Sequence, residues 1–436
     1  AMDQTEKLII DIIDQHRDEI IEFARDIYTH AELGYKEFRT SQKFVNKMKE
    51  LGLHTETGFA ITGVKAYLNE ENASLALLGE LDALRIPEHA YVNPETDAAH
   101  CCGHHAQMAG IFGAALALTV PEIAEKLGGQ VVFFATPAEE YGEIEFKNQL
   151  REQGKIRYGG GKCELIRTGA FDDIDLCLAH HIQPGDEIQV GSGTGNGFVS
   201  KVIRYLGKAA HAAGAPDKGV NALSAASLGL QALGLNRETF RDEDCVRVHP
   251  IITKGGNLVN VIPDEIVIET LVRAKTIEAF TDAAKKTDRS FQAGAVAMGA
   301  KVEITTLPGY LPTLAEQALP ELKRAAELAA PEVPVREAAG HSGGSTDVGD
   351  VQHLMPVYTF NTGGVKGGLH QINFEVTNEE EAYIDTAKMF ALAAYGLLKE
   401  KAARSKELVK NYKPVFKDSA EYTKFMEQFD SKEVLD

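Results

Sequence analysis

Four short, almost entirely apolar runs constrain the fold of this chain more than any other feature. They occupy residues 74–78, 129–135, 175–179 and 355–360. Polar clusters follow these runs. A continuous apolar run of this length is typical of a strand that is buried on both faces, as in a parallel sheet covered by helices. We therefore expect an α/β fold built on a mostly parallel central sheet.

Amphipathic helices are expected to cover this sheet. Apolar side chains recur at helical spacing over residues 5–28 and 38–51, and the segment after Ala106 also fits a covering helix. Near the C-terminus, Thr377 and Glu380 have the spacing of a capping box, which predicts a helix from Glu380 to Lys399. The charged sequence beyond residue 402 is mostly helical in character and indicates no function.

A separate small domain is predicted inside the larger one. Between residues 197 and 307 the expected order is strand, helix, strand, strand, helix, strand. This βαββαβ order is the ferredoxin-like arrangement of a small independent domain. Glycine-rich residues 191–197 and the turn Leu307-Pro308-Gly309 mark its ends. We expect a discontinuous larger domain over residues 1–196 and 308–436, with residues 197–307 inserted into it.

Composition and charge limit the classes of partner. Of the 436 residues, 44% are hydrophobic and 25% are charged, as in ordinary globular proteins. The formal net charge of −19 argues against nucleic acid or an anionic membrane as the main partner. No apolar stretch approaches the roughly 18 residues of a membrane span, and the amphipathic N-terminal segment is unlike a signal peptide. Five cysteines without a disulfide-like pattern favour a reducing compartment, so we expect a cytoplasmic location.

Two glycine-rich segments resemble nucleotide-binding loops only superficially. Residues 191–197 are followed by β-rich sequence, where a dinucleotide loop requires a helix. Residues 159–162 end in Lys162 but lack the upstream glycine and the Ser/Thr of a phosphate-binding loop. Neither segment therefore predicts a nucleotide site.

The densest group of candidate ligands is the segment His100-Cys101-Cys102-Gly103-His104-His105. Cys102 and His104 offer sulfur and nitrogen ligands close enough to share one ion, and Gly103 allows the tight turn between them. A zinc knuckle would need a second pair of ligands at similarly short spacing, and the sequence contains none. Buried polar residues with a purely structural role are the alternative, and metal binding is favoured over it.

Three further groups follow apolar runs in the same way. They are Glu139-Glu140, His180-His181 and His370. Adjacent side chains point apart, so one glutamate can bind a metal while the other serves as a base. Taken singly, the histidines are better explained as ordinary hydrogen-bonded residues, and the acids as residues favoured at a helix N-terminus. Ligands gather at the carboxyl ends of the strands of an open parallel sheet, so these groups can converge.

The number of candidate ligands indicates more than one metal ion. Asp82, which follows the first apolar run, can orient a metal-bound histidine. The remaining candidates are one cysteine, two or three histidines and one or two carboxylates, which exceeds the four ligands of a tetrahedral zinc ion. The sequence therefore predicts two ions that share ligands.

In this order the motifs resemble the aminoacylase/carboxypeptidase metallopeptidases. The motifs are Asp82-Ala83-Leu84, Cys102-Gly103-His104, Glu139-Glu140, His181 with Pro184, and Leu369-His370. The resemblance covers residues 8–400 or so and is closest to the amidohydrolase subgroup, which includes hippurate, indole-acetyl-amino-acid and aminobenzoyl-glutamate hydrolases. Further matches are His30-Ala31-Glu32-Leu33-Gly34, Thr40-Ser41, the segment from Gly207 to His211, Asn260 with Pro263 and Arg273, and Ser345-Thr346-Asp347. The last two of these, with Asp97 to His100, favour the aminobenzoyl-glutamate branch.

The resemblance implies a two-metal site in the larger, catalytic domain, with the inserted domain serving as lid and dimerisation surface. The metal ligands that it implies are Cys102, His104, Glu140, His181 and His370. It implies Glu139 as general base, and His211 and Asn260 as lid residues that complete the active site of the other subunit. The subgroup usually has Cys-Gly-His-Asp-x-His, where this chain has His105 and Gln107 in place of the Asp and the last His.

We therefore expect a metal-dependent amidohydrolase or peptidase that acts on N-acyl amino acids, aminobenzoyl-glutamate-like conjugates or small dipeptides. Glu139 would take a proton from a metal-activated water and pass it to the leaving amine, and His211 would stabilise the oxyanion. Arg273 is the candidate for binding a substrate carboxylate, although a structural ion pair explains it nearly as well. The mixed ligands suit zinc best and tolerate manganese or cobalt.

Two other functional classes stay open. A metal- or ligand-binding protein with little or no turnover is suggested by His105 and Gln107, but it would have no need of Glu139. A thiol enzyme using Cys101 or Cys102 would be inhibited by alkylation and indifferent to chelators.

Overall fold

The computed structural model describes residues 1–436, which divide into two compact units. The first unit comprises residues 1–193, 314–340 and 350–422, and the second comprises residues 194–313, 341–349 and 423–436. The second unit extends past the predicted range of 197–307 at both ends and includes two later segments of the chain.

An eight-stranded sheet forms the centre of the first unit. Its strands, in spatial order, are β1 (His54–Phe59), β2 (Gly63–Tyr67), β6 (Val131–Thr136), β3 (Leu75–Glu80), β7 (Leu176–Ile182), β17 (Val357–Thr362), β8 (Ile188–Val190) and β15 (Val335–Glu337). The four strands from β6 to β17 are parallel and largely buried, and they correspond to the four apolar runs. The predicted α/β class with a mostly parallel central sheet is confirmed.

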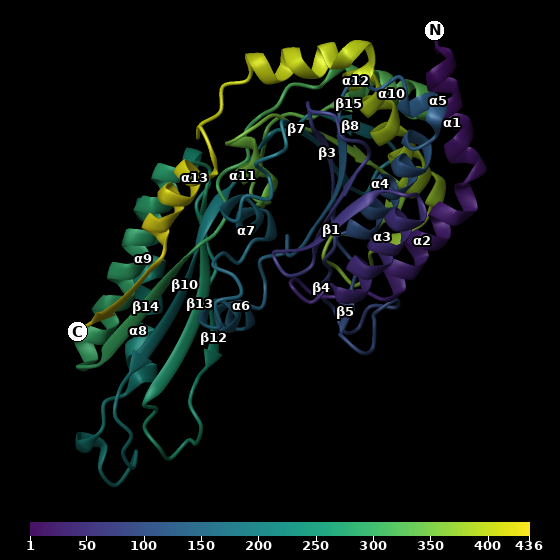
Figure 1. Ribbon diagram of the computed structural model, residues 1–436. Helices are drawn as coiled ribbons and strands as arrows, with labels where there is room; N and C mark the ends of the chain where they lie inside the picture. Colours follow the sequence, from purple (N-terminus) through teal and green to yellow (C-terminus); the bar gives the residue numbers. More distant parts are fainter. The chain divides into compact units, whose positions relative to one another are not determined.

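Helices pack beside this sheet (Figure 1). The helices are α1 (Gln4–Gln15), α2 (Arg17–Thr29), α3 (Phe38–Glu50), α4 (His104–Leu118) and α12 (Thr386–Asn411). Helix α4 contacts β3, β6 and β7 directly and is buried at every position, because α1, α2 and α12 cover it from outside. No helix of the structure combines the length and apolar character that a membrane span requires.

Two predicted helical features differ in detail. The expected helix over residues 5–28 is broken at His16, which ends α1 and precedes α2. The expected capping box at Thr377 is wrong: Asn378 accepts the backbone N–H of Glu381 at 3.2 Å, whereas the Thr377 hydroxyl donates to the carbonyl of Gly364. A π-helical segment, η4 (Glu380–Asp385), then leads into α12.

The second unit contains a sheet with two helices packed against it (Figure 1). Its strands run in the order β11 (Arg247–Val248), β13 (Glu265–Ala274), β10 (Gly197–Leu206), β14 (Lys301–Pro308) and β20 (Ser431–Leu435), and β12 (Ile251–Lys254) also pairs with β13. The helices α8 (Ala222–Asn236) and α9 (Ile277–Met298) lie side by side. Along the chain, β10, α8, β11/β12, β13, α9 and β14 follow the predicted βαββαβ order.

The C-terminal segment has a structural role that its sequence does not indicate. After α13 (Ser419–Met426), the strand β20 pairs antiparallel with β14 from Ser431 to Leu435. This pairing covers the edge of β14 that would otherwise expose unpaired backbone groups.

Candidate metal centre

The candidate ligands of the first unit come from chain segments at the carboxyl ends of neighbouring parallel strands. Asp82 lies two residues beyond β3, Glu139 lies three beyond β6, and His181 is the penultimate residue of β7. Because these strands are parallel, their carboxyl ends meet at one edge of the sheet. The topology therefore brings together side chains that are far apart in the sequence.

A left-handed glycine sets the geometry of the Cys-Gly-His turn. Gly103 has φ of 72° and immediately precedes α4, so His104 is the first residue of that helix. A Cβ atom at this position would lie 2.1 Å from Cγ2 of Ile182, which no real side chain tolerates. Glycine is therefore required here for both backbone conformation and space. The turn places Cys102 and His104 on the same side of the helix start.

Cys102, His104 and His181 form the first group of candidate ligands. Their ligand atoms all lie within 4.8 Å of one another. The Sγ atom of Cys102 is 3.3 Å from Nε2 of His181, and the rings of His104 and His181 are perpendicular with centroids 5.8 Å apart. One ion can be reached by all three side chains.

Cys102, Glu140 and His370 form a second group with the same mutual spacing. Nε2 of His370 lies 3.1 Å from Oε1 of Glu140. The loop that carries His370 is tied to the Cys-Gly-His turn, because the backbone N–H of His370 donates to the carbonyl of Cys101 at 2.9 Å. Cys102 belongs to both groups, so the five predicted ligands are arranged as two clusters that share the thiol.

The protonation pattern at His104 fits a bound cation. Its Nδ1 lies 2.7 Å from the carbonyl oxygen and 3.2 Å from Oδ1 of Asp82, and both are acceptors, so Nδ1 carries a proton. Its Nε2 is buried without a hydrogen-bond partner and faces carboxylate oxygens. Burial disfavours a charged ring, but Glu80, Cys102 and Asp82 raise the pKa of His104 well above its ordinary value, so Nε2 takes up a cation, which can be a proton or a metal ion. Asp82 thus contacts His104 in the way predicted for an orienting carboxylate.

The carboxylates of both Glu139 and Glu140 lie near Nε2 of His104. Oε2 of Glu139 lies 3.7 Å from Nε2 of His104, and Oε1 of Glu140 lies 3.8 Å from it. The expectation that the two side chains point apart assumed strand-like alternation, but these residues follow β6 in irregular backbone. Their partners still differ, since only Glu140 pairs with His370 and donates its backbone N–H to Asp82.

Electrostatics around the centre favour ionised carboxylates. Burial alone raises the pKa of Glu140, but the contacts with His370 and His104 outweigh it and bring the pKa to about 2. Burial raises the pKa of the Cys102 thiol well above its ordinary value. A cation beside the sulfur is what would allow the thiolate to form.

Three residues at the centre were not predicted as part of it. Glu80, the last residue of β3, points its carboxylate toward His104 and forms a close ion pair with Lys162. Gln107 on α4 donates to the same carboxylate at 2.9 Å. Lys162 ends the glycine-rich segment 159–162, whose pattern predicts neither a phosphate-binding loop nor a place at this centre. No pattern in the sequence links it to Glu80.

The other histidines of the clusters lie outside both ligand groups. Nε2 of His105 pairs with the hydroxyl of Tyr383 at 2.9 Å, and burial lowers the pKa of His105 to about 3, so its ring is neutral. His180 alternates with His181 along β7, and its Nε2 lies 2.7 Å from the Thr362 hydroxyl. These side chains are hydrogen-bonded residues of the core.

Two of the three candidate residues of the second unit, His211 and Asn260, lie close together. His211 is exposed, and its Nδ1 accepts the backbone N–H groups of Ala213 and Gly214. Asn260 is also exposed, and its carbonyl accepts the N–H of Ala212 at 3.0 Å. His211 and Asn260 therefore lie on neighbouring stretches of one loop region.

Arg273 is half-buried in the second unit. Its guanidinium donates to Nε2 of His249 at 3.1 Å and to the Ser345 hydroxyl at 2.9 Å, and it lies over the ring of Phe198.

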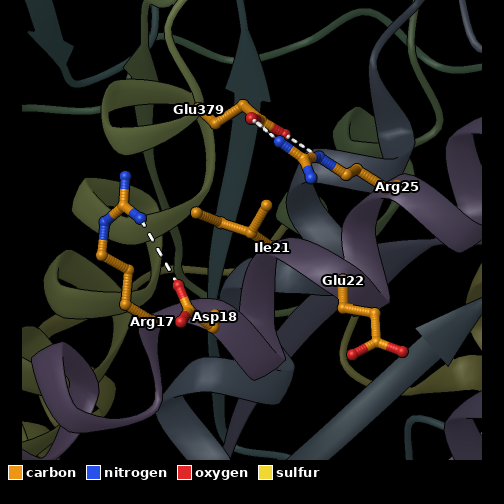
Figure 2. A pocket seen from close by; sticks show the side chains of 6 residues that line it. All are labelled: Arg17, Asp18, Ile21, Glu22, Arg25 and Glu379. Atoms are coloured by element: carbon orange, nitrogen blue, oxygen red, sulfur yellow. Dashed lines mark hydrogen bonds and ion pairs between the residues drawn. The ribbon is translucent and has the colours of Figure 1, made fainter.

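A surface hollow of about 420 Å³ lies elsewhere on the first unit (Figure 2). Its charged side chains pair with one another: Arg25 binds Glu379 at 2.5–2.7 Å, and Arg17 lies 3.7 Å from Asp18. The pair Arg25–Glu379 connects α2 to the start of the C-terminal helical segment. The hollow holds none of the candidate ligands, so the chemistry is not located there.

Comparisons with known proteins agree with this arrangement. The family model described as "Peptidase family M20/M25/M40" matches residues 76–395. The Xaa-Arg dipeptidase of Mus musculus is 26% identical over 424 residues, which are 92% of this chain and 88% of that protein. One of the subunits of the p-aminobenzoyl-glutamate hydrolase of Escherichia coli (strain K12) is 27% identical over 283 residues, 63% of this chain and 54% of that protein.

The solved structures include a similar fold with a described metal site. The Bacillus subtilis YXEP protein, described as a dinuclear metal binding peptidase from the M20 family, aligns with a TM-score of 0.62 over 88% of this chain and 99% of its own, at 23% identity. The predicted resemblance to metallopeptidases with amidohydrolase relatives is confirmed. Because the family model covers most of the chain, including every segment that carries a candidate ligand, this protein belongs to peptidase family M20/M25/M40 and is a hydrolase of amide bonds.

Proposed function

We propose that this hydrolase cleaves small amides that carry a free carboxylate, such as N-acyl amino acids, aminobenzoyl-glutamate-like conjugates and dipeptides. The observation that carries the proposal is the convergence of the two ligand groups around Cys102, with the carboxylate of Glu139 3.7 Å from His104. The relatives named as a dipeptidase and as an aminobenzoyl-glutamate hydrolase act on amides of this kind.

The residues that would hold two divalent ions are Cys102, His104, Glu140, His181 and His370. When bound, such ions supply Lewis-acid polarisation of the amide carbonyl and a water of lowered pKa. Thiolate, imidazole and carboxylate together suit zinc best, with manganese or cobalt as substitutes. Zinc is therefore our proposed metal.

Glu139 would move the proton during hydrolysis. Its side chain is buried beside the ligands, with Oε2 3.7 Å from Nε2 of His104. A carboxylate in this position can accept a proton from the attacking water and deliver it to the leaving nitrogen. The spare carboxylate favours a hydrolase over a protein that only stores metal.

The second unit would recognise the substrate. The loop N–H groups that donate to Nδ1 of His211 fix its tautomer, so a neutral ring carries its proton on Nε2 and can donate to an oxyanion. Arg273, whose guanidinium donates to His249 and Ser345, is our proposed binder of the substrate carboxylate. Asn260 would assist from the same loop region as His211.

We further propose a homodimer formed through the second unit. The edge strand β12 exposes Ile251 and Ile252, and the loop beyond it exposes Leu258 and Val259. Contiguous exposed apolar side chains at a sheet edge favour pairing with another chain. The free thiols of all five cysteines are consistent with the cytoplasm as the proposed location.

The test is hydrolysis of a panel of amides by the purified protein before and after removal of metal. The panel comprises aminobenzoyl-glutamate, hippurate, N-acetyl amino acids and dipeptides, each paired with its carboxamide. We expect chelation to abolish turnover, zinc to restore it, and the carboxamides to be poor substrates. Equal turnover by metal-free and metal-loaded protein would overturn the proposal. In that case, loss of turnover after alkylation of the thiols would identify a cysteine-dependent enzyme.

A further inference from the structure

Glu80 is held at the metal centre by two buried residues, Lys162 and Gln107. The residue Glu80 is 4% exposed, and Lys162, which is fully buried, donates to Oε2. Gln107 binds it twice: the amide nitrogen donates to Oε1 at 2.9 Å, and the amide oxygen accepts the backbone N–H of Glu80 at 3.0 Å. The carboxylate therefore has one orientation.

That orientation brings two acceptors together. Oε1 of Glu80 lies 3.2 Å from Nε2 of His104, and the proton of this imidazole is on Nδ1, facing Asp82. Two acceptors approach this closely only with a cation between them, which is a proton in the metal-free protein and would be a metal ion in the loaded one. Two ligands of one tetrahedral ion are separated by a little over 3 Å, given bond lengths of about 2.0–2.2 Å.

We propose that Glu80 is a further metal ligand of this centre, positioned by Lys162 and Gln107. It would bind through Oε1 the same ion as His104. The inference rests on the proposed two-metal site and adds a sixth side chain to it. Glu80, His104 and Glu139 in fact have ligand atoms within 4.8 Å of one another, which is the spacing found in the two groups around Cys102.

The chemistry of Gln107 explains why it suits this position. A carboxamide presents a donor and an acceptor at the same end, so it can bind both the carboxylate and the backbone N–H of Glu80. The two nitrogens of a histidine face opposite sides of the ring, so histidine cannot make both bonds. Gln107 is therefore a positioning residue, because its two hydrogen bonds fix the orientation of the Glu80 carboxylate.

Lys162 offsets the charge that the additional carboxylate brings. Glu80, Glu139, Glu140 and an ionised Cys102 would place four negative charges around two ions. The buried ammonium group neutralises one of them while leaving Oε1 of Glu80 available to metal. A centre with less net negative charge keeps its Lewis acidity, which hydrolysis requires.

The experiment measures zinc affinity and stoichiometry by competition with a chromophoric chelator. The variants are Glu80→Gln, Glu80→Asp and Gln107→Leu, with Glu164→Gln as the control for replacing a buried, ion-paired glutamate outside the centre. We expect Glu80→Gln and Glu80→Asp to weaken binding of one zinc ion at least tenfold, and Gln107→Leu to weaken it roughly 10–100-fold, as for other residues that orient ligands. Glu164→Gln should bind zinc as the wild type does.

The outcomes separate the possibilities. Affinity within twofold of wild type for Glu80→Gln and Gln107→Leu would overturn the inference while leaving the metal centre intact. Loss of affinity in Glu80→Gln but not in Glu80→Asp would show that charge alone matters, and would also overturn it. If the wild type bound no divalent ion, the proposed metal centre itself would fail. Should Glu80→Gln not fold, as judged by circular dichroism, Gln107→Leu decides.

Discussion

Glu139 and Glu140 are neighbours in the chain and both face His104, yet their surroundings prepare them for different tasks. Glu140 is fixed by His370 at 3.1 Å and by the Asp82 carboxylate, which accepts its backbone N–H at 2.9 Å. Because His370 is itself a candidate metal ligand, the Glu140 carboxylate beside it is placed to bind the same ion. Glu139, whose Oε2 lies 3.7 Å from Nε2 of His104, is instead the proposed proton carrier between water and leaving group.

Replacing each glutamate by glutamine should therefore have different effects. Glu139→Gln removes the proton carrier, and we expect kcat to fall roughly 10²–10⁴-fold while both metal ions are retained. Glu140→Gln removes a ligand, so metal content should fall with activity. Elemental analysis beside steady-state kinetics distinguishes the two variants. Near-normal turnover by Glu139→Gln would show that the proton carrier is another residue.

The element that matters most for the centre is the turn that begins α4. Gly103 is left-handed at φ of 72°, and its missing Cβ leaves space for the side chain of Ile182 on β7. The contact joins the helix start to the strand that carries His181. The geometry of the ligands is thus determined by the packing of a helix end against a strand end.

A methyl group at Gly103 should disturb the centre. We expect Gly103→Ala to lower zinc affinity and thermal stability together, because the new Cβ would overlap Ile182. Gly154→Ala is the matched control, since Gly154 has φ of 73° and open space around it. It should cost about 1–2 kcal/mol for the left-handed conformation and leave zinc affinity unchanged. Equal zinc affinity in both variants would contradict this account.

The π-helical segment η4 contains a buried acid whose effect on stability should depend on pH. Burial, together with the charge of Glu380, raises the pKa of Asp385 to about 7. In the unfolded chain an aspartate has an ordinary pKa near 4, so between roughly pH 4 and 7 the folded protein binds more protons. Stability from this group is therefore present at low pH and is lost as the pH rises toward 7.

Asp385→Asn removes that titration. Relative to wild type, the variant should gain unfolding free energy between pH 5 and pH 8, on the order of 1–3 kcal/mol. Denaturant unfolding at both pH values measures the difference, and comparing the two pH values cancels any effect of the substitution that does not depend on pH. A difference that stays constant from pH 5 to pH 8 would show that Asp385 is ionised throughout.

Local patterns predicted most elements but not the breaks between them. β13 and α9 lie where their alternating and helical patterns indicate, because those patterns report burial directly. The break at His16 contains neither glycine nor proline and gives no local signal. β20 forms because β14 offers an edge far away in the sequence. Charged, exposed residues such as Lys432 and Glu433 could not indicate a strand.

At the metal centre, too, sequence patterns predicted some features, and others depend on tertiary contacts alone. Cys102, His104 and the two glutamates could be predicted to converge, since each follows a strand or begins a helix at one edge of the sheet. Glu80 and Lys162 pair through tertiary contacts alone, and no periodicity or short motif connects residues so far apart. Sequence patterns therefore indicate which ligands are available, and only the folded chain shows what holds them.

At the scale of the whole molecule, the proposed function divides the work between two subunits. If His211 completes the site of the partner, then His211→Ala and Glu139→Gln damage different chains of the same active site. Mixing the two inactive proteins should form hybrid dimers in which one of the two sites has both groups, so part of the activity should return. Each variant mixed with itself is the control, and metal content should be unchanged in His211→Ala.

The alternative is that His211 only organises its own loop through the N–H groups of Ala213 and Gly214. In that case mixing restores nothing, and sedimentation would find a fully active monomer. Measuring the oligomeric state together with recovered activity separates the two cases.

The strand order of the large sheet affects how this protein is made. β17 lies between β7 and β8, although it is formed from residues 357–362, long after both neighbours have been synthesised. Until those residues leave the ribosome, the apolar strand β7 has an open edge and the helix α12 that covers α4 does not yet exist. Such an edge is prone to pair with other nascent chains. Growing chains that stop short of β17 should therefore aggregate, and translation that stalls within this interval would endanger the protein before it can bind metal.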